Sequence, residues 1–103
     1  MHQFKIKGID HPAVAAENVE ALASWYCEVL GYERLFLDPR PIWLLRAPDG
    51  SILEILPVDG NPRPVRINLT PGWSHVAFKV DDIEVAIQHL DNHDIKWSSP
   101  LSP

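Results

Sequence analysis

GIDHPAVAAENVEALASWYCEVLGYE, residues 8–33, has a counterpart in GWSHVAFKVDDIEVAIQHLDNHDIKW, residues 72–97. The two stretches align at an offset of 64 residues, which places His11 on His75. A repeat at a fixed spacing indicates two similar structural modules. Here it sets two imidazoles at equivalent points, and imidazole is the commonest metal ligand among side chains. The repeat therefore favours a shared metal or substrate site over two unrelated core histidines.

The composition is that of an ordinary globular domain. The chain has 103 residues, of which 46% are hydrophobic and 22% charged, and its formal net charge is −5. This length predicts one domain. The sequence shows no basic patch, so nucleic acid is not an expected partner, and its apolar runs are too short to span a membrane. A single cysteine, Cys27, and an N-terminus without the apolar run of a secretory signal favour a reducing cytoplasm.

Hydrophobic periodicity predicts a first module of order β-α-β-β-β over about 4–57. The expected helix is capped by Asn18 or Glu17 and ends before Gly31, a residue type that commonly follows a helix. The Asp-Gly pair at 49–50 lies between two apolar runs and is typical of a tight hairpin turn. The expected elements are a strand over 5–15, a helix over 19–30 and strands over 33–37, 42–47 and 51–56.

A proline-rich linker over 58–72 separates this module from part of a second one over 73–103. The second module is expected to open with a strand over 73–80, followed by a helix for which Asp81 and Glu84 form an acidic capping box. Both helices carry an apolar stripe for packing on the outer face of the strands. The residues expected to meet in this packing are Val14, Leu53, Ile55, Val76 and Phe78 from the strands, and Leu22, Tyr26, Ile83 and Ile87 from the helices.

Glu54 lies inside the apolar strand expected over 51–56. A carboxylate in such a place is rarely buried unless it is paired or holds a metal. If the sheet curls so that their faces converge, His11, Glu54 and His75 form a set of two histidines and one carboxylate. Such a set suits Zn²⁺, Ni²⁺, Fe²⁺ or Mn²⁺, and spacing alone does not choose among them. The structural alternative is that both histidines are surface or satisfied core residues and that Glu54 faces solvent.

Weaker candidates lie elsewhere in the chain. Trp43, on the expected hairpin, is a candidate wall of a ligand cavity. His89 and His93 are spaced i, i+4 and can bind a metal from one helix face, although a solvated helix end explains them as well. Arg63 and Arg66 in the linker are candidates for holding an anionic substrate group, and the alternative is that both are merely solvated.

A resemblance to a known family rests on three motifs. They are HPAVAAEN with WYCEVLGY within 11–32, PDGSILEI at 48–55 and GWSHVAFKVDD at 72–82. Together they resemble the vicinal oxygen chelate superfamily. That superfamily includes glyoxalase I, methylmalonyl-CoA epimerase, fosfomycin-resistance enzymes, extradiol dioxygenases and bleomycin-resistance proteins. The resemblance covers nearly the whole chain, which is therefore interpreted as a single glyoxalase-like domain, residues 1–103.

The resemblance implies an α+β fold of paired βαβββ modules that form a cupped mixed sheet with the helices outside. It also implies metal-ligand roles for His11, Glu54 and His75. In such proteins the last strand of the second module supplies a fourth ligand, a Glu, which the repeat places past Pro103. The second module is therefore expected to be incomplete in this chain. We expect either a homodimer, in which a partner module covers the exposed strand edges, or a native chain of roughly 120–130 residues.

For function, the resemblance implies a metal-dependent enzyme of the glyoxalase or epimerase type that acts on a small molecule. A divalent Zn, Ni, Mn or Fe ion would take two neighbouring substrate oxygens and stabilise an enolate-like intermediate, with Glu54 as a ligand and candidate base. Two alternatives stay open. One is an Fe(II) extradiol-type dioxygenase, which uses a similar ligand set. The other is a metal-free small-molecule or drug-binding protein of the bleomycin-resistance kind, in which Trp43 and other aromatic residues stack on the ligand.

Overall fold

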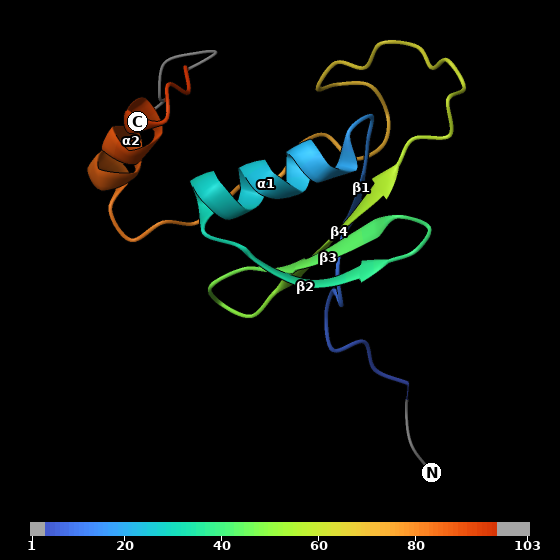
Figure 1. Cartoon of the computed structure of the whole chain (residues 1–103), viewed down its shortest axis with the longest axis horizontal. Helices are drawn as coiled ribbons and strands as arrows, with labels where there is room; N and C mark the ends of the chain where they lie inside the picture. Colours follow the sequence, from blue (N-terminus) through green and yellow to red (C-terminus); the bar gives the residue numbers. More distant parts are fainter. Residues whose placement is uncertain (1–3, 97–103) are drawn as a thin grey trace. The chain divides into compact units, whose positions relative to one another are not determined.

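The structure is a computed structural model that describes residues 4–96 of the chain. The chain divides into two compact units, residues 1–61 and 62–103. The first unit has the β-α-β-β-β order predicted from the sequence, and the second contains a helix (Figure 1). The elements are β1 (Ala13–Ala16), α1 (Val19–Leu30), β2 (Glu33–Asp38), β3 (Ile42–Arg46) and β4 (Ile52–Pro57) in the first unit, and α2 (Ile83–Asn92) in the second.

The four strands form one mixed sheet in the order β1-β4-β3-β2. β1 pairs with β4 in parallel, whereas β3 pairs with both β4 and β2 in antiparallel fashion. Glu54 on β4 is flanked by Ala13 on one side and by Leu44 on the other. The register of β2 against β3 shifts between Arg34 and Phe36, which marks a bulge. The α+β class expected from the sequence is confirmed, with one βαβββ module formed.

α1 begins and ends where its capping residues place it. Of the two expected caps, Asn18 is the one used, and its side-chain oxygen accepts a 2.9 Å hydrogen bond from the Ala21 N–H. At the other end Gly31 takes a left-handed conformation with φ of 74°, which costs a glycine little because it has no Cβ. Its N–H donates to the carbonyl of Tyr26, so the last turn is closed by hydrogen bonding.

α1 packs against one face of the sheet, and the buried core lies between them (Figure 1). Alternation along β4 sends Leu53 and Ile55 toward this core, so Glu54 lies on the opposite face. Complete burial of a side chain such as Ile55 stabilises the fold by roughly 1.5–3 kcal/mol. The predicted packing of the first module is confirmed. Its core consists of Val19, Ala23, Leu45, Leu53 and Ile55, with Val14, Leu22 and Tyr26 packed against it.

The first strand is shorter than the sequence predicted. The alternating pattern over 5–15 indicated a strand through His11, but β1 spans only Ala13–Ala16, and His11 precedes it. The ladder with β4 begins where the Glu54 N–H donates to the carbonyl of Pro12 at 3.0 Å. The four strands of the described chain pair only with one another. Residues before Pro12 therefore have no neighbouring strand within 4–96 to take up their backbone groups.

The expected strand over 73–80 is also wrong, because these residues form no strand. Their alternation is real, but a strand also needs a partner along its edge, and the sheet of the described residues ends at β1 and β2. The packing expected around it is absent as well. Val76 is 70% exposed, Phe78 52% and Ile83 51%, so these side chains do not form the buried contact that was expected between residues 73–80 and α2.

α2 begins where the repeat places it, but its cap is Asp82 and not Asp81. The Asp82 carboxylate accepts hydrogen bonds from the N–H groups of Glu84 and Val85. Within residues 4–96, neither helix is long and apolar enough to cross a membrane.

Candidate metal site

His11 and Glu54 form a direct pair on the sheet face away from α1. Nε2 of His11 lies 2.8 Å from Oε2 of Glu54, and Nδ1 of the same ring lies 2.7 Å from Oδ2 of Asp10. The imidazole is thus held between two carboxylates. The Glu54 side chain is 22% exposed and that of His11 35%, whereas that of Asp10 is 96% exposed. The two hydrogen bonds thus link the side chains of Asp10, His11 and Glu54 in a row that runs from solvent to the sheet surface.

The parallel pairing of β1 with β4 brings this pair together. Ala13 lies beside Glu54 in the ladder, and the Glu54 N–H is bonded to the carbonyl of Pro12. His11 therefore directly precedes Pro12, the residue whose carbonyl accepts the hydrogen bond from the Glu54 N–H. Pro12 lacks an N–H, which fits its place at the first rung of an edge strand. The position of the imidazole is fixed by backbone pairing as well as by its side-chain contacts.

The electrostatics of the pair favour a proton on His11. Its pKa is raised above the ordinary 6.5, first by the hydrogen bond to Asp10 and next by the hydrogen bond to Glu54. A second ion pair lies within electrostatic range of Glu54. Arg40 is bonded to Asp38, which lowers the pKa of the Asp38 carboxyl, and the negative charge of Glu54 helps to raise the pKa of Arg40.

The donors of this pair fit a divalent metal ion. Two ligands that bind one ion at about 2.0–2.2 Å and about 90° to each other lie about 3 Å apart. The 2.8 Å separation of the His11 and Glu54 donors is close to that value. A ligating histidine normally donates its other ring N–H to a carboxylate or carbonyl, and Asp10 occupies that place. A proton on Nε2 and a metal ion would thus compete for the same position.

The sheet around Glu54 is apolar. In the ladder Glu54 is followed by Leu44 on β3 and then by Phe36 on β2, so these side chains share a face. Phe36 is 54% exposed, and the same face carries the half-buried Ile52 and Leu56. Glu54 thus has apolar neighbours on a face that also carries the Asp38–Arg40 ion pair.

Trp43 and His75, the other predicted site residues, have different surroundings from this pair. Trp43 packs against the core on the α1 side of the sheet, where its Nε1–H donates to Glu20 at 2.8 Å and Arg34 lies over its ring at 4.6 Å. Trp43 and Glu54 therefore lie on opposite faces. His75 belongs to the second unit, where its Nδ1 lies 2.9 Å from the Ser74 hydroxyl oxygen. A contribution of His75 to the site stays a prediction.

Across residues 4–96, no group of three or more His, Cys, Asp and Glu side chains is placed to surround a metal ion. His11 and Glu54 are the two donors that the first unit brings together. Sequence reasoning missed Asp10 as the partner of His11, although a carboxylate directly before a candidate ligand was a usable signal.

Cys27 and Arg66 have structural explanations. Cys27 is partly buried and packs against the core of the first unit. Arg66 donates hydrogen bonds to three backbone carbonyls of its own loop, those of Thr70 at 2.9 Å, Pro71 at 3.1 Å and Trp73 at 2.9 Å. The guanidinium therefore organises the loop that leads to residue 73.

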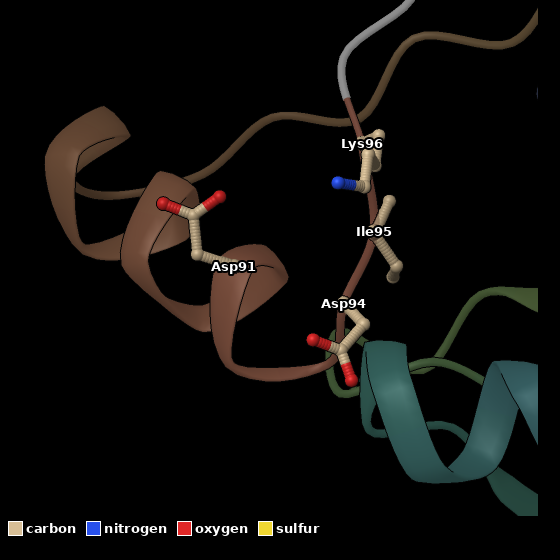
Figure 2. A pocket seen from close by; sticks show the side chains of 4 residues that line it. All are labelled: Asp91, Asp94, Ile95 and Lys96. Atoms are coloured by element: carbon tan, nitrogen blue, oxygen red, sulfur yellow. The ribbon is translucent and has the colours of Figure 1, made fainter.

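A shallow hollow lies where α2 ends, as Figure 2 shows. Its lining side chains are those of Asp91, Asp94, Ile95 and Lys96. Three of the four residues are exposed, and opposite charges at such close positions are ordinary on a solvated helix end. We assign no function to this hollow.

The comparisons with known proteins identify one family model and one curated relative that match most of the chain. The family model described as Glyoxalase/Bleomycin resistance protein/Dioxygenase superfamily matches residues 8–103. The uncharacterized protein YaeR of Escherichia coli K12 is 30% identical over 97 residues, and the match covers 88% of this chain and 74% of that protein.

Solved structures share the fold. A glyoxylase/bleomycin resistance protein/dioxygenase domain from Frankia sp. EAN1pec matches with a TM-score of 0.71 and 21% identity, over 87% of this chain and 71% of that one. A mutant of the fosfomycin resistance protein FosX from Listeria monocytogenes, complexed with Mn(II) and 1S,2S-dihydroxypropylphosphonic acid, matches with a TM-score of 0.70 and 12% identity. That match covers 96% of this chain and 73% of that one.

Proposed function

This chain belongs to the glyoxalase/bleomycin resistance protein/dioxygenase superfamily, and we propose that it is a metal-dependent enzyme of the glyoxalase or epimerase type. The observation that carries the proposal is the pair of His11 and Glu54, whose donor atoms lie 2.8 Å apart with Asp10 on the other ring nitrogen. The substrate class is a small molecule with two neighbouring oxygen atoms. The Mn(II) bound by FosX, which shares the fold, supports a divalent ion here.

The proposed ligands are His11, Glu54 and His75, and the proposed ions are Zn, Ni, Mn or Fe. His75 is included because the 64-residue repeat aligns it with His11. A bound divalent ion would supply a Lewis acid for negative charge that develops on the substrate oxygens. Asp10 holds the His11 ring with Nδ1 protonated, which leaves the Nε2 lone pair for binding.

Glu54 is the proposed base as well as a ligand. Its carboxylate is 22% exposed, so it is accessible to a bound substrate whose proton it would take. The apolar side chains of Leu44 and Phe36 beside it would pack against the carbon skeleton of the substrate and exclude solvent from it. In this proposal the chain's own residues position the substrate and receive its proton.

We also propose a homodimer as the working form. Phe36 on the face of Glu54 is 54% exposed, and Leu35 and Leu37 on the edge strand β2 are 42% and 47% exposed. Apolar surface of this kind on a strand edge and a sheet face is normally covered. A second copy can cover it by placing a module alongside. Light scattering during size-exclusion chromatography would measure the mass.

The same apolar face favours a second candidate function, metal-free binding of a small apolar molecule. In that case the bond between His11 and Glu54 at 2.8 Å is a structural contact, and Phe36 with its neighbours contacts the ligand. The Fe(II) dioxygenase alternative uses the same donors as the proposed enzyme and would differ by the metal found.

Metal analysis of protein made without an affinity tag or chelators tests the proposal. The wild type is expected to hold a divalent metal at this site, and Glu54→Gln should lose it while the fold is kept, because an amide is a much poorer ligand. Glu28→Gln on the exposed side of α1 removes the same charge away from the pair and serves as the matched control. Equal metal content in Glu54→Gln and in the wild type would refute the site.

A further inference from the structure

His89 and His93 form a second pair of imidazoles, on α2 in the second unit. Both residues are exposed, and their ring centroids lie 4.5 Å apart with an interplanar angle of 45°. Residues spaced i, i+4 are neighbours on one helix face, so the helix itself holds the two rings side by side. This arrangement does not involve His11 or Glu54.

The tautomer of His93 is fixed by its hydrogen bond. Its Nδ1 lies 2.9 Å from the backbone carbonyl oxygen of His89. A carbonyl oxygen can only accept, so Nδ1 must carry the hydrogen, and the lone pair of the neutral ring resides on Nε2. A backbone carbonyl on the far ring nitrogen is one of the usual supports of a ligating histidine. The ring of His93 is therefore oriented before any ion binds.

The turn that ends α2 holds His93 in place. Asp94 adopts a left-handed conformation with φ of 58°, the Asp94 N–H donates to Asp91, and the Ile95 N–H donates to Leu90, each at 3.0 Å. These are the two bonds of a Schellman motif, which closes the C-terminus of a helix. Two carboxylates, those of Asp91 and Asp94, lie at the same helix end (Figure 2) and favour the approach of a cation.

The separation of the rings matches that of two imidazoles on one ion. A metal–nitrogen bond of about 2.0–2.1 Å puts each ring centroid about 3.2 Å from the metal, and two rings at about 90° then have centroids about 4.5 Å apart. The observed separation is 4.5 Å. Ligand angles near 90° are typical of Cu²⁺ and Ni²⁺ in square-planar or octahedral sites, whereas tetrahedral Zn²⁺ prefers wider angles.

We propose that His89 and His93 form a second metal site, suited to Cu²⁺ or Ni²⁺ and independent of the pair in the first unit. The two imidazoles are the protein ligands, and water fills the remaining positions, because the described residues place no third His, Cys, Asp or Glu with them. The site is an exposed chelate on a single helix. A measurement of the metal content of this chain would therefore include a second metal ion, bound at this site.

The test follows backbone amide signals of the full chain by NMR while Cu²⁺ is added below one equivalent. Paramagnetic Cu²⁺ should erase the signals of residues 88–94, because both rings lie within this stretch. The matched control exchanges two neighbours, Gln88→His with His89→Gln, which keeps composition and charge but moves the imidazole off the face of His93. This exchange and His93→Gln should each need at least tenfold more Cu²⁺ for the same loss of signal. Circular dichroism checks that α2 is kept.

Glu54→Gln separates this proposal from the proposed function. It should leave the loss of signal at 88–94 unchanged, whatever it does to metal in the first unit. The second site is overturned if the amide signals of residues 88–94 persist in the wild type when Cu²⁺ is added. It is also overturned if the exchanged variant loses these signals at the same Cu²⁺ concentration as the wild type. Loss that depends on Glu54 would show that these histidines belong to a common site, and the proposed independence would be wrong.

Discussion

Asn18 and Asp82 occupy the same position in two helices: each is the N-cap, and each accepts hydrogen bonds from N–H groups of the first turn. The helices that they cap begin at Val19 and Ile83, the spacing that also relates His11 to His75. The repeat seen in the sequence is therefore a structural repeat at the level of the helices. The strands that should accompany the second helix are not formed within residues 4–96.

The cap of α1 gives the first prediction. Asn18→Ala removes the acceptor for the Ala21 N–H and should lower the free energy of unfolding by about 1 kcal/mol. Asn18→Asp keeps an acceptor, adds a negative charge at the helix N-terminus and should cost little or nothing. Urea unfolding followed by circular dichroism measures both. Equal losses for the two variants would mean that the cap contributes through something other than its hydrogen bond.

Two neighbouring residues on β4 test which face of the sheet is the core. Ile55 is fully buried against α1, whereas Leu56 lies on the opposite face and is half-buried. Ile55→Ala should cost about 2–5 kcal/mol, because it opens a cavity in the core. Leu56→Ala should cost clearly less. Denaturant midpoints compare them, and a reversed order would assign Glu54 to the helix side.

The raised pKa of His11 predicts how stability changes with pH. The folded protein binds the His11 proton more tightly than the unfolded chain, in which the pKa is near the ordinary 6.5. The contribution to stability is therefore fully present below 6.5 and is lost as the pH rises through the folded-state pKa. Glu54→Gln and Asp10→Asn should each lower that pKa, and Asp10→Asn more, since its hydrogen bond is the larger cause. An NMR titration of the His11 ring protons measures all three proteins.

Metal affinity should rise with pH, whereas the contribution of the His11 proton to stability falls. The proton on Nε2 of His11 must leave before an ion binds there, so metal affinity should rise as the pH passes the pKa of His11. Titrations of apo protein at several pH values would show this. A flat profile between pH 6 and pH 8 would argue that His11 is not a ligand.

Arg66 gives a prediction for the loop before His75. Its guanidinium donates to three backbone carbonyls, an arrangement that the single ammonium group of lysine cannot reproduce. Arg66→Lys should therefore raise the amide hydrogen-exchange rates of residues 67–74 while α1 and the sheet stay protected. Unchanged exchange in Arg66→Lys would show that the loop does not depend on these bonds.

α1 and β4 of the first unit were predictable because each buries a single face. Leu53 and Ile55 alternate with half-buried positions, and the stripe of α1 recurs at helical spacing, so local pattern and final packing agree. The strand expected over 73–80 shows where that reasoning ends. Alternation describes which side chains are apolar, but a strand also requires a backbone partner, and no local pattern says where that partner lies.

Part of the candidate site was also predictable from the local sequence pattern. Glu54 stood out as a carboxylate in an apolar strand, and the repeat drew attention to His11. Asp10 gave no periodic signal, because it lies in an exposed segment outside any element. The placement of Trp43 followed from register: Leu44 lies opposite Glu54, so Trp43 must face the other way. Register between strands depends on the turn and on packing, which local periodicity does not contain.

The parallel ladder between β1 and β4 has a consequence for folding kinetics. β3 and β4 meet through a short turn, and such hairpins close within about 1–10 microseconds. His11 and Glu54 are separated by 43 residues, so their meeting requires closure of a much longer loop and a larger loss of chain entropy. A chain in which only the hairpin has formed already contains Glu54 in its strand but has no imidazole beside it. The two donors come together only when the non-local contacts of the sheet are complete, so an ion bound by both would stabilise the native state relative to the partly folded chain.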